Sequence, residues 1–302
     1  MKRILITGKT SYIGTSFASY IKDNLEYHVD TLSVRGEDWK TQDFSLYDVV
    51  LHVAGIAHAD VGKVSEEEKK RYYDVNCDLS YDVANKYKID RGDKSSQFIY
   101  MSSIIVYGED VSIRKKRVIT SDTVPTPSNF YGDSKLQAEI KLKKLMTETF
   151  ILSIVRPPMI YGPGSKGNYP MLRKIALKLP VFPDIPNERS MLYVGNLNIF
   201  LKELIDSPES GVFYPQNNEY VRTSHMVKEI ARAHGKNIKL FSFMNWSIYL
   251  LSYVPGKIGD LTNKAFGNLV YHKKQLNRDR FMDNKKTIEL TESDVDEKNF
   301  SS

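Results

Sequence analysis

Cysteine and long apolar runs are the two features that this chain of 302 residues most clearly lacks. Its single cysteine, Cys77, cannot form an intramolecular disulfide, and such a composition is typical of proteins in a reducing compartment. The longest apolar candidate, residues 246–254, is far shorter than the ~18 residues of a membrane span. The first eight residues also lack the apolar stretch of a signal peptide. These absences predict a cytoplasmic protein without a membrane span.

A strong excess of either charge is also missing. The chain has 43 Lys and Arg against 37 Asp and Glu, which gives a net charge of +6 spread along the sequence. We therefore expect no nucleic-acid partner, although the mild excess suits a small anionic ligand. His, Cys, Asp and Glu do not recur at the spacings of a metal site, so no metal is expected.

The first 22 residues combine a strand, a glycine-bearing turn and a helix. Residues 3–7 are apolar and β-rich, as in a buried parallel strand, and residues 15–22 favour a helix. Between them lies the pattern Gly-x-x-Ser-x-x-Gly, from Gly8 to Gly14. In such a unit, backbone N–H groups and the helix dipole face a pyrophosphate. The arrangement predicts a dinucleotide-binding turn in which Ser11 replaces the usual middle glycine.

The end of the second predicted strand, residues 28–34, carries the signal for cofactor choice. An acidic residue about 20 positions beyond the glycine turn would bind the ribose hydroxyls of NAD. This strand instead ends with Ser33 and is followed by Arg35. A hydroxyl and a guanidinium suit a 2′-phosphate, which favours NADP(H), but a solvated arginine in a loop is the alternative reading.

Three further segments of the first half are predicted to border the cofactor. A strand over 47–55 ends in Val-Ala-Gly, and small residues there let a cofactor ring lie against the backbone. Asn76 lies midway along a predicted helix, 64–87, where it bonds locally or turns toward the next strand. The strand 97–103 places Ser103 at its carboxyl end, where open α/β sheets bind ligands. Residues 109–129 are polar and read as a loop.

The stretch that follows this loop contains Tyr131 and Lys135. The helix is predicted over 135–146, and side chains four residues apart share one helical face. A nearby ammonium favours the phenolate and lowers the pKa of a tyrosine, so the two groups form a proton-handling pair. The pattern alone is common, and two solvated side chains are its plain alternative.

Together these motifs resemble a known family. Their order along residues 2–290 is similar to that of the extended short-chain dehydrogenase/reductase family, in its NAD-dependent epimerase/dehydratase branch. The motifs that carry the resemblance are the glycine turn, Val53-Ala54-Gly55, Ser-Ser-Ile-Ile-Val-Tyr-Gly (102–108), Tyr131-x-x-x-Lys135, Arg-Pro-Pro-Met-Ile-Tyr-Gly-Pro-Gly (156–164) and Arg-Ser-Met-Leu-Tyr-Val (189–194). The resemblance implies an α/β fold: a Rossmann-type doubly wound parallel sheet with a smaller C-terminal α/β substrate domain.

The resemblance also assigns residues to roles. Ser103, Tyr131 and Lys135 match the catalytic hydroxyl, the acid/base and its pKa-lowering partner, and Ser103 and Tyr131 also contact substrate. The implied cofactor-binding positions are Gly8, Ser11, Tyr12, Ile13, Gly14, Ser33, Arg35, Val53, Ala54, Gly55, Asn76, Tyr131, Lys135 and Pro158. The departures from the family pattern are Ser11 for glycine and Ser33 for the usual acid, and the second leaves NAD or NADP open.

The second half is expected to bind the substrate. We predict an NAD(P)-binding domain over 1–165 and a mainly substrate-binding domain over 166–302, with some segments returning to the sheet. In the resembling UDP-hexose enzymes, the nucleotide diphosphate meets residues matching Asn168 and Arg189, with Arg280 a weaker candidate. A helix cap and a surface arginine are the alternative roles of the first two. The aromatic-rich segment 241–271 is expected to be core, or alternatively an apolar lid.

The implied activity is NAD(P)(H)-dependent hydride transfer at C4 of a UDP-hexose or UDP-HexNAc, as in polysaccharide biosynthesis. The Ser33/Arg35 ending favours a UDP-4-keto-6-deoxy-HexNAc reductase over a UDP-glucose or UDP-N-acetylglucosamine 4-epimerase. A dehydratase is disfavoured because Ile104 and Ile105 follow Ser103 where those enzymes carry acids. A remote alternative is a non-catalytic NAD(P)-sensing regulator. A homodimer is a candidate assembly.

Overall fold

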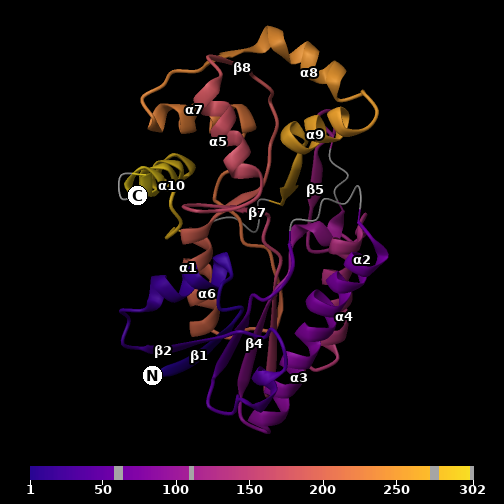
Figure 1. Cartoon of the computed structure of the whole chain (residues 1–302), viewed down its shortest axis with the longest axis vertical. Coiled ribbons are helices and arrows are strands. Elements are labelled where there is room, and N and C mark those ends of the chain that lie inside the picture. Colours follow the sequence, from indigo (N-terminus) through magenta and orange to yellow (C-terminus); the bar gives the residue numbers. More distant parts are fainter. Residues whose placement is uncertain (58–63, 109–111, 273–278, 300–302) are drawn as a thin grey trace. The chain divides into compact units, whose positions relative to one another are not determined.

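The chain folds into two compact units. The computed structural model describes residues 1–57, 64–108, 112–272 and 279–299 (Figure 1). The first unit comprises Met1–Gly108, Val124–Pro157 and Leu197–Pro215, and the second comprises Glu109–Thr123, Pro158–Asn196 and Gln216–Ser302. The chain therefore passes between the units several times. Relative to the predicted boundary at residue 165, residues 109–123 and 158–165 group with the second unit, whereas 197–215 groups with the first, as expected for a segment that returns to the sheet.

A six-stranded, fully parallel sheet forms the centre of the first unit. The strand order is β2-β1-β3-β4-β6-β10. The bounds are β1 Lys2–Thr7, β2 Tyr27–Leu32, β3 Val49–His52, β4 Ser96–Met101, β6 Phe150–Val155 and β10 Gly211–Phe213. Every residue of β3 and β4 is buried, as expected for parallel strands that are covered on both faces. The predicted doubly wound Rossmann-type sheet is confirmed.

Helices cover the two faces of this sheet. Figure 1 shows α2, α3 and α4 on one face and α1 and α6 on the other. The bounds are α1 Tyr12–Ile21, η1 Asp38–Thr41, α2 Glu66–Tyr73, η2 Asp74–Asp78, α3 Leu79–Arg91, η3 Ile104–Tyr107, α4 Phe130–Lys143 and α6 Val194–Asp206. Fully buried Phe98, Tyr87 and Leu142 belong to the apolar core between the sheet and the α3–α4 side. This burial joins the sheet, α3 and α4 into one packed framework.

The strand order places a topological switch point between β1 and β3. From β1, the chain moves outward to β2 and then returns to the other side of β1, at β3, before continuing to β4. In open α/β sheets, ligands bind outside the carboxyl ends of the strands at such a reversal. The residues after β1 and after β3 are the glycine turn and Val53-Ala54-Gly55. The topology therefore brings the two predicted cofactor motifs to one crevice.

The second unit is built from short strand pairs and helices. Its parallel pairs are β5 with β12, β7 with β9 and β8 with β11. The bounds are β5 Arg117–Ile119, β7 Met159–Tyr161, α5 Asn168–Lys178, β8 Val181–Pro183, β9 Met191–Tyr193, α7 Thr223–Ala233, β11 Lys239–Phe241, η4 Ser242–Met244, α8 Asn245–Leu251, α9 Lys257–Phe266, β12 Leu269–Tyr271 and α10 Asn284–Asn299. Within the described ranges, no helix combines the length and the apolar character that crossing a membrane requires.

Four expectations from the sequence need correction. The loop expected over 109–129 contains β5, which pairs with β12, a strand 152 positions further along the chain. The helix expected over 64–87 is divided by the π-helical turn Asp74–Asp78. The helix expected from residue 135, α4, begins at Phe130, because Asn129 caps it. The segment 241–271 is not mostly core, because most of the large apolar side chains between 243 and 261 are exposed.

Candidate active site

The glycine turn connects β1 to α1 at the carboxyl edge of the sheet. Gly8 has a φ of +106°, and a Cβ there would lie 2.8 Å from the backbone N of Ala54. Only glycine fits this conformation and this close approach. Ser11 is the N-cap of α1, and its Oγ accepts a hydrogen bond from the N–H of Gly14 (3.0 Å). The serine that replaces the usual glycine therefore has a capping role that glycine could not supply.

The segment after β3 forms the facing wall of the turn. The N–H of Val53 donates to the carbonyl of Thr7 (3.1 Å), which ties this wall to β1. A Cβ on Gly55 would lie 3.0 Å from Asn76 Oδ1 and 3.1 Å from Lys135 Nζ. The backbone at Gly55 is thus the point where the predicted cofactor wall and the predicted catalytic lysine meet.

Asn76 is completely buried and holds this wall in place. Its Oδ1 accepts from the N–H of Ile56 (2.8 Å), and its Nδ2 donates to the Ile56 carbonyl (3.1 Å) and to Ser134 Oγ (3.1 Å). The π-helical turn Asp74–Asp78 contains this side chain, and π-bulges are frequent at functional sites. The amide therefore joins the wall to α4, and the local-bonding alternative does not describe its side chain, whose partners lie 20 and 58 positions away in the chain.

Ser33 and Arg35 lie just beyond the end of β2, and both are exposed. Ser33 Oγ accepts a bond from the N–H of Arg35 (3.4 Å). The N–H of Gly8 bonds to the carbonyl of Leu32 (2.9 Å), so the end of β2 and the glycine turn are adjacent. The hydroxyl and the guanidinium are therefore available at the position where a family member would bind the adenosine ribose.

Lys135 is 6% exposed and projects from the first turns of α4. Its Nζ donates to the carbonyl of Met101 (3.0 Å) at the end of β4 and lies 5.0 Å from the centre of the Tyr100 ring. Burial, opposed by the charge of Glu139, lowers the pKa of Lys135 from 10.5 to about 8. The amine is thus held at the carboxyl edge of the sheet in a site that penalises its charge.

Ser103 and Tyr131 approach this edge from adjoining elements. Ser103 follows β4 and caps the short helix η3, with Oγ accepting from the N–H of Ile105 (3.3 Å). Gly132 lies against η3, where a Cβ would be 2.7 Å from the Ile105 carbonyl oxygen. The absence of a side chain at Gly132 allows the start of α4 to pack directly on the segment that carries Ser103.

Tyr131 lies in the first turn of α4 and is half-buried. Its ring packs edge-on against Tyr72 of α2, with a centroid separation of 6.0 Å. The side chain of Asn129 caps the helix by accepting from the N–H of Gly132 (2.9 Å). The cap and the ring contact together fix the position of the Tyr131 side chain at the start of α4. Lys135 lies one turn further along the same helical face.

A buried ion pair that the sequence reasoning did not find lies beneath this site. Glu139, one turn beyond Lys135, is completely buried and accepts from Arg156 Nε (2.9 Å), from Arg156 Nη2 and from Ser102 Oγ (2.5 Å). Arg156 also donates to Tyr107 Oη (2.6 Å). Burial opposes the charge of Arg156, but the bonds to Glu139 outweigh it and raise the pKa of the guanidinium. The pair anchors α4 and the residue next to Ser103 to the sheet.

His52 ends β3 as a structural side chain. It is fully buried, with Nδ1 2.7 Å from Thr7 Oγ1 and Nε2 3.0 Å from Ser80 Oγ. Burial, followed by the charge of Lys135, lowers the pKa of His52 to about 3, so the imidazole is neutral. Among the described residues, no group of three or more His, Cys, Asp or Glu is placed to hold a metal ion.

The chemistry of these residues fits a dinucleotide. The turn approaches the β3 wall too closely for a side chain at Gly8, and the N-terminus of α1 follows it directly. Backbone N–H groups and the positive end of the helix dipole favour a pyrophosphate there. Gly55, Lys135 and Ser103 then line one continuous edge of the sheet. A nicotinamide bound along that edge would lie beside the amine and the hydroxyl.

The remaining predicted residues belong to the second unit. Pro158 is its first residue after the segment Val124–Pro157. Asn168 is the exposed first residue of α5, preceded by Gly167 as the N-cap, so the helix-cap alternative for Asn168 is not what the structure shows. Arg189 donates to the carbonyl of Lys264, and burial lowers its pKa. Arg280 is exposed. Their binding roles stay predictions.

Comparison with known proteins settles the family. The model of the NAD dependent epimerase/dehydratase family matches residues 4–218. This chain belongs to that family. It is 30% identical to a UDP-glucose 4-epimerase of Vibrio cholerae over 89% of this chain and 86% of the relative. It is 27% identical to N-acetyl-alpha-D-glucosaminyl-diphospho-ditrans,octacis-undecaprenol 4-epimerase of Escherichia coli O157:H7, over 87% and 81% of the two chains.

Solved structures of the superfamily share the fold. A UDP-glucuronic acid 4-epimerase from Bacillus cereus in complex with NAD superposes with a TM-score of 0.70 at 17% identity, covering 98% of this chain and 99% of the other. A dTDP-4-dehydrorhamnose reductase from Bacillus anthracis in complex with NADP gives 0.65 at 18% identity, covering 100% of both chains. The expected family, the Rossmann-type fold and an NAD(P)-dependent epimerase or oxidoreductase are therefore confirmed.

Proposed function

We propose that this protein is an NADPH-dependent reductase of a UDP-4-keto-6-deoxy-HexNAc that works in the cytoplasm. The observation that carries the proposal is the exposed Ser33/Arg35 pair beside the glycine turn. An arginine there accommodates a 2′-phosphate, whereas an acid would repel it. NADPH arrives reduced and leaves oxidised, which is the requirement of a net reduction.

A UDP-glucose or UDP-N-acetylglucosamine 4-epimerase is the second candidate. The two curated relatives named above are both 4-epimerases, and this is the observation that favours it. An epimerase returns the hydride to the opposite face of the same carbon, so its cofactor undergoes no net change. Both candidates use the same three side chains. The regulator alternative is weaker, because Tyr131 and Lys135 both lie on one face of α4.

The proposed chemistry acts at C4 of the sugar. The bound dihydronicotinamide supplies the hydride. Tyr131 donates its phenolic proton to the oxygen that the hydride converts from ketone to alkoxide, and Ser103 donates a hydrogen bond to the same oxygen. Lys135 provides the positive charge that keeps the phenolate accessible, and it binds the nicotinamide ribose. A dehydratase would need further proton-transfer groups after Ser103, where this chain has Ile104 and Ile105.

The nucleotide end of the substrate is assigned to the second unit. Arg189 and the weaker candidate Arg280 carry the charge and the donors that a diphosphate requires, and Asn168 lies at the start of a helix. Binding would require Arg189 to exchange its bond to the Lys264 carbonyl for the phosphate. Arg189→Ala should therefore weaken UDP binding, measured calorimetrically, while leaving NADPH binding unchanged.

One assay distinguishes the two candidates. The purified protein is incubated separately with a UDP-4-keto-6-deoxy-HexNAc, UDP-glucose and UDP-N-acetylglucosamine, each with NADPH or NADH, while the absorbance of reduced nicotinamide is followed. A reductase oxidises one NADPH per keto sugar. Conversion between C4 isomers without net oxidation would establish the epimerase and reject the reductase.

The choice of cofactor can be tested at the end of β2. Arg35→Ala should raise the KM for NADPH by about tenfold to a hundredfold, because a charged hydrogen-bonding partner of the phosphate is lost. The KM for NADH should change little. Arg71→Ala on the exposed surface of α2 is the matched control. Equal effects of Arg35→Ala on both cofactors would reject the phosphate-binding role of Arg35.

A further inference from the structure

A segment of the second unit presents large apolar side chains to solvent. Phe243 is 71% exposed, Trp246 66%, Leu250 58% and Tyr253 61%. They lie in or next to η4 and α8, and Ile258 and Leu261 of α9 continue the exposed apolar series. We call residues 241–261 the apolar hairpin. Soluble proteins rarely expose such a series without a partner that covers it.

The spacing of these residues is that of one helix face. Phe243, Trp246, Leu250 and Tyr253 are separated by three, four and three residues, so at helical period they form one stripe. Residues 241–259 contain no Asp or Glu. The stripe is therefore apolar and aromatic and lacks negative charge, as in helices that lie in the interface of a bilayer.

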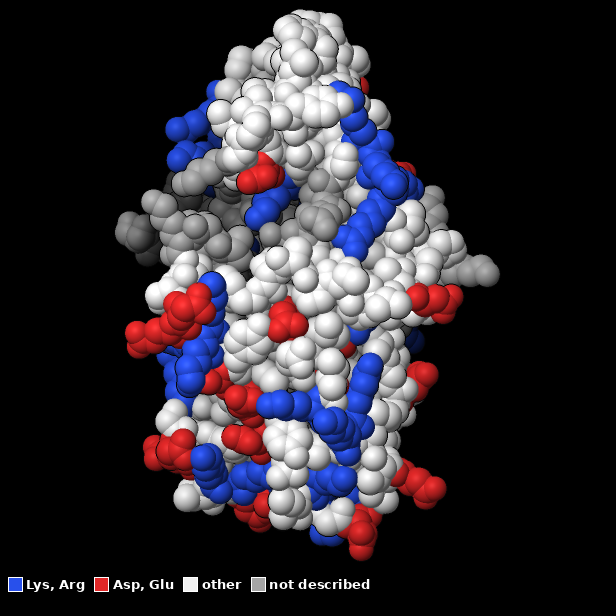
Figure 2. All heavy atoms as spheres, turned by 90° about the vertical axis from the view of Figure 1, so that its right-hand side faces the viewer, with Lys and Arg blue, Asp and Glu red and all other residues white. Residues whose placement is uncertain are grey.

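Basic side chains flank the hairpin. The guanidinium of Arg114 lies 4.0 Å from the centre of the Tyr253 ring and 5.9 Å from that of Tyr249. Among the described residues, Arg114 forms no ion pair with an acid; Lys116 pairs with Glu188. Figure 2 shows this side of the second unit as an uncharged surface with Lys and Arg beside it and few acids.

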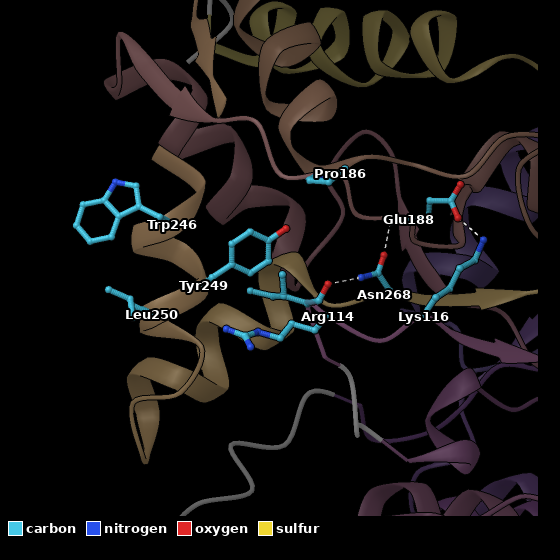
Figure 3. A pocket seen from close by; sticks show the side chains of 9 residues that line it. Arg114, Lys116, Pro186, Glu188, Trp246, Tyr249, Leu250 and Asn268 are labelled. Carbon is cyan, nitrogen blue, oxygen red and sulfur yellow. Dashed lines mark hydrogen bonds and ion pairs between the residues drawn. The ribbon is translucent and has the colours of Figure 1, made fainter. Parts of the chain in front are cut away.

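A pocket of about 840 Å³ is lined both by residues of the hairpin and by these cations. Tyr249 of α8 points across it toward Pro186 and Asn268, Arg114 lies beside Tyr249, and Lys116 lies on the opposite side next to Glu188 (Figure 3). Trp246 and Leu250 also line the pocket, and most of their surface is open to solvent. Apolar side chains of the hairpin and the cations Arg114 and Lys116 thus lie together at one pocket, which we call the basic recess.

We propose that the apolar hairpin docks the protein onto the surface of an anionic lipid bilayer. Trp246, Leu250 and Phe243 would enter the boundary between headgroups and acyl chains, where tryptophan and tyrosine are favoured. Arg114 and Lys116 would then meet the negative headgroups, because they line the same pocket as Trp246 and Leu250. Charge complementarity selects this occupant: a second copy of the chain would bring the same basic recess against itself.

Vesicle co-sedimentation of the full chain tests the proposal. Vesicles of phosphatidylglycerol and phosphatidylcholine should bind the protein, and vesicles of phosphatidylcholine alone should bind it weakly. The chain has two tryptophans, and Trp39 is 2% exposed. Brominated acyl chains should therefore quench the fluorescence of Trp246 and leave the fluorescence of Trp39 unchanged. Absence of binding to the anionic vesicles would overturn the proposal.

Substitutions locate the docking surface. Trp246→Ser with Leu250→Ser should lower vesicle binding at least about tenfold, because two apolar side chains no longer enter the bilayer. Arg114→Gln should lower it about fivefold at low salt. The matched controls are Leu25→Ser, at a position 92% exposed outside the hairpin, and Lys144→Gln at the exposed C-cap of α4; neither should change binding. Equal losses from the controls would contradict the proposal.

Two further outcomes would contradict the proposal of an anionic bilayer. If sedimentation velocity shows a dimer that the Trp246→Ser, Leu250→Ser variant dissociates, a second copy covers the hairpin and the proposal fails. If vesicle binding is insensitive to salt and to lipid charge, the basic recess takes no part in it. Trp246 and Leu250 do not belong to the predicted active site around Ser103 and Lys135. The Trp246→Ser, Leu250→Ser variant should therefore keep its turnover of a soluble substrate.

Discussion

The phenol of Tyr131 is the atom group on which the proposed chemistry depends most. Tyr131→Phe removes only the hydroxyl and keeps the ring that packs on Tyr72. We expect turnover to fall by about a hundredfold to ten-thousandfold, the usual contribution of a general acid. Cofactor binding, measured by fluorescence titration, should be retained. Tyr73→Phe, which loses only a bond to Asp133 (2.7 Å), is the control and should remain active. An active Tyr131→Phe variant would reject the mechanism.

The buried charge of Lys135 destabilises the folded state. Its pKa of about 8 lies below the ordinary 10.5, and the difference corresponds to about 3 kcal/mol. Below pH 8 the amine is charged in both folded and unfolded chains, so the folded state bears the full burial penalty. Lys135→Met should therefore be inactive, yet up to about 3 kcal/mol more stable at pH 7. Urea unfolding of both proteins measures this difference.

The pH dependence of that difference has a definite sign. Between pH 8 and 10.5 the unfolded chain still holds the proton that folded Lys135 has released. Stability of the wild type therefore rises with pH through this window relative to Lys135→Met. The advantage of the variant should shrink to nearly zero by pH 10.5. An advantage that is constant from pH 7 to pH 10.5 would show that burial does not lower the pKa of Lys135.

Glu139 is predicted to be the most sensitive side chain behind the site. Glu139→Gln leaves the guanidinium of Arg156, whose side chain is 5% exposed, without its counter-charge. Removal of one partner from a buried pair typically costs about 3–5 kcal/mol. Glu66→Gln, which breaks an exposed pair with Lys69, should cost less than about 1 kcal/mol. Similar unfolding free energies for the two variants would contradict the anchoring role of Glu139.

At the scale of elements, the meeting of α4 with η3 sets the geometry between Tyr131 and Ser103. A Cβ at Gly132 would lie 2.7 Å from the Ile105 carbonyl oxygen, so Gly132→Ala must push the two elements apart. We expect a large loss of kcat with cofactor affinity nearly unchanged, since displacement by about 1 Å costs about a hundredfold. Gln137→Ala on the same helix is the control. Full activity of Gly132→Ala would contradict the constraint.

Elements also show what the sequence could and could not predict. The strands and the glycine turn were predictable because buried parallel strands are apolar throughout and glycine marks the turn. Strand β5 was not, because its pairing with β12 is a long-range contact that polar local residues do not signal. The hairpin 241–261 was misjudged because apolar residues indicate burial only when a surface covers them. Nothing in composition reveals such a surface.

The site residues divide in the same way. Ser103, Tyr131 and Lys135 could be named from their order along the chain, and the structure places them at one edge of the sheet. The anchoring role of Glu139 was missed, although the four-residue step from Tyr131 to Lys135 continues to it. The helical spacing alone cannot show that Arg156, which directly follows β6, donates hydrogen bonds to the carboxylate of Glu139.

For the whole molecule, the first unit alone contains the predicted catalytic residues and most of the cofactor residues. The sheet order β2-β1-β3-β4-β6-β10 creates the switch point, and the residues after β1, β3 and β4 meet there. The second unit contributes the predicted substrate residues and the apolar hairpin. The central step of the proposed reaction is therefore the transfer of one hydride from the cofactor at the switch point to a carbon of the sugar.

Transfer of deuterium from cofactor to sugar tests this central claim most directly. NADPH deuterated at C4 of the nicotinamide is incubated with a UDP-4-keto-6-deoxy-HexNAc and the protein, and the product is analysed by mass spectrometry and NMR. We predict one deuterium at C4 of the sugar, and none with Tyr131→Phe. A product without deuterium, or with deuterium at another carbon, would contradict hydride transfer at C4.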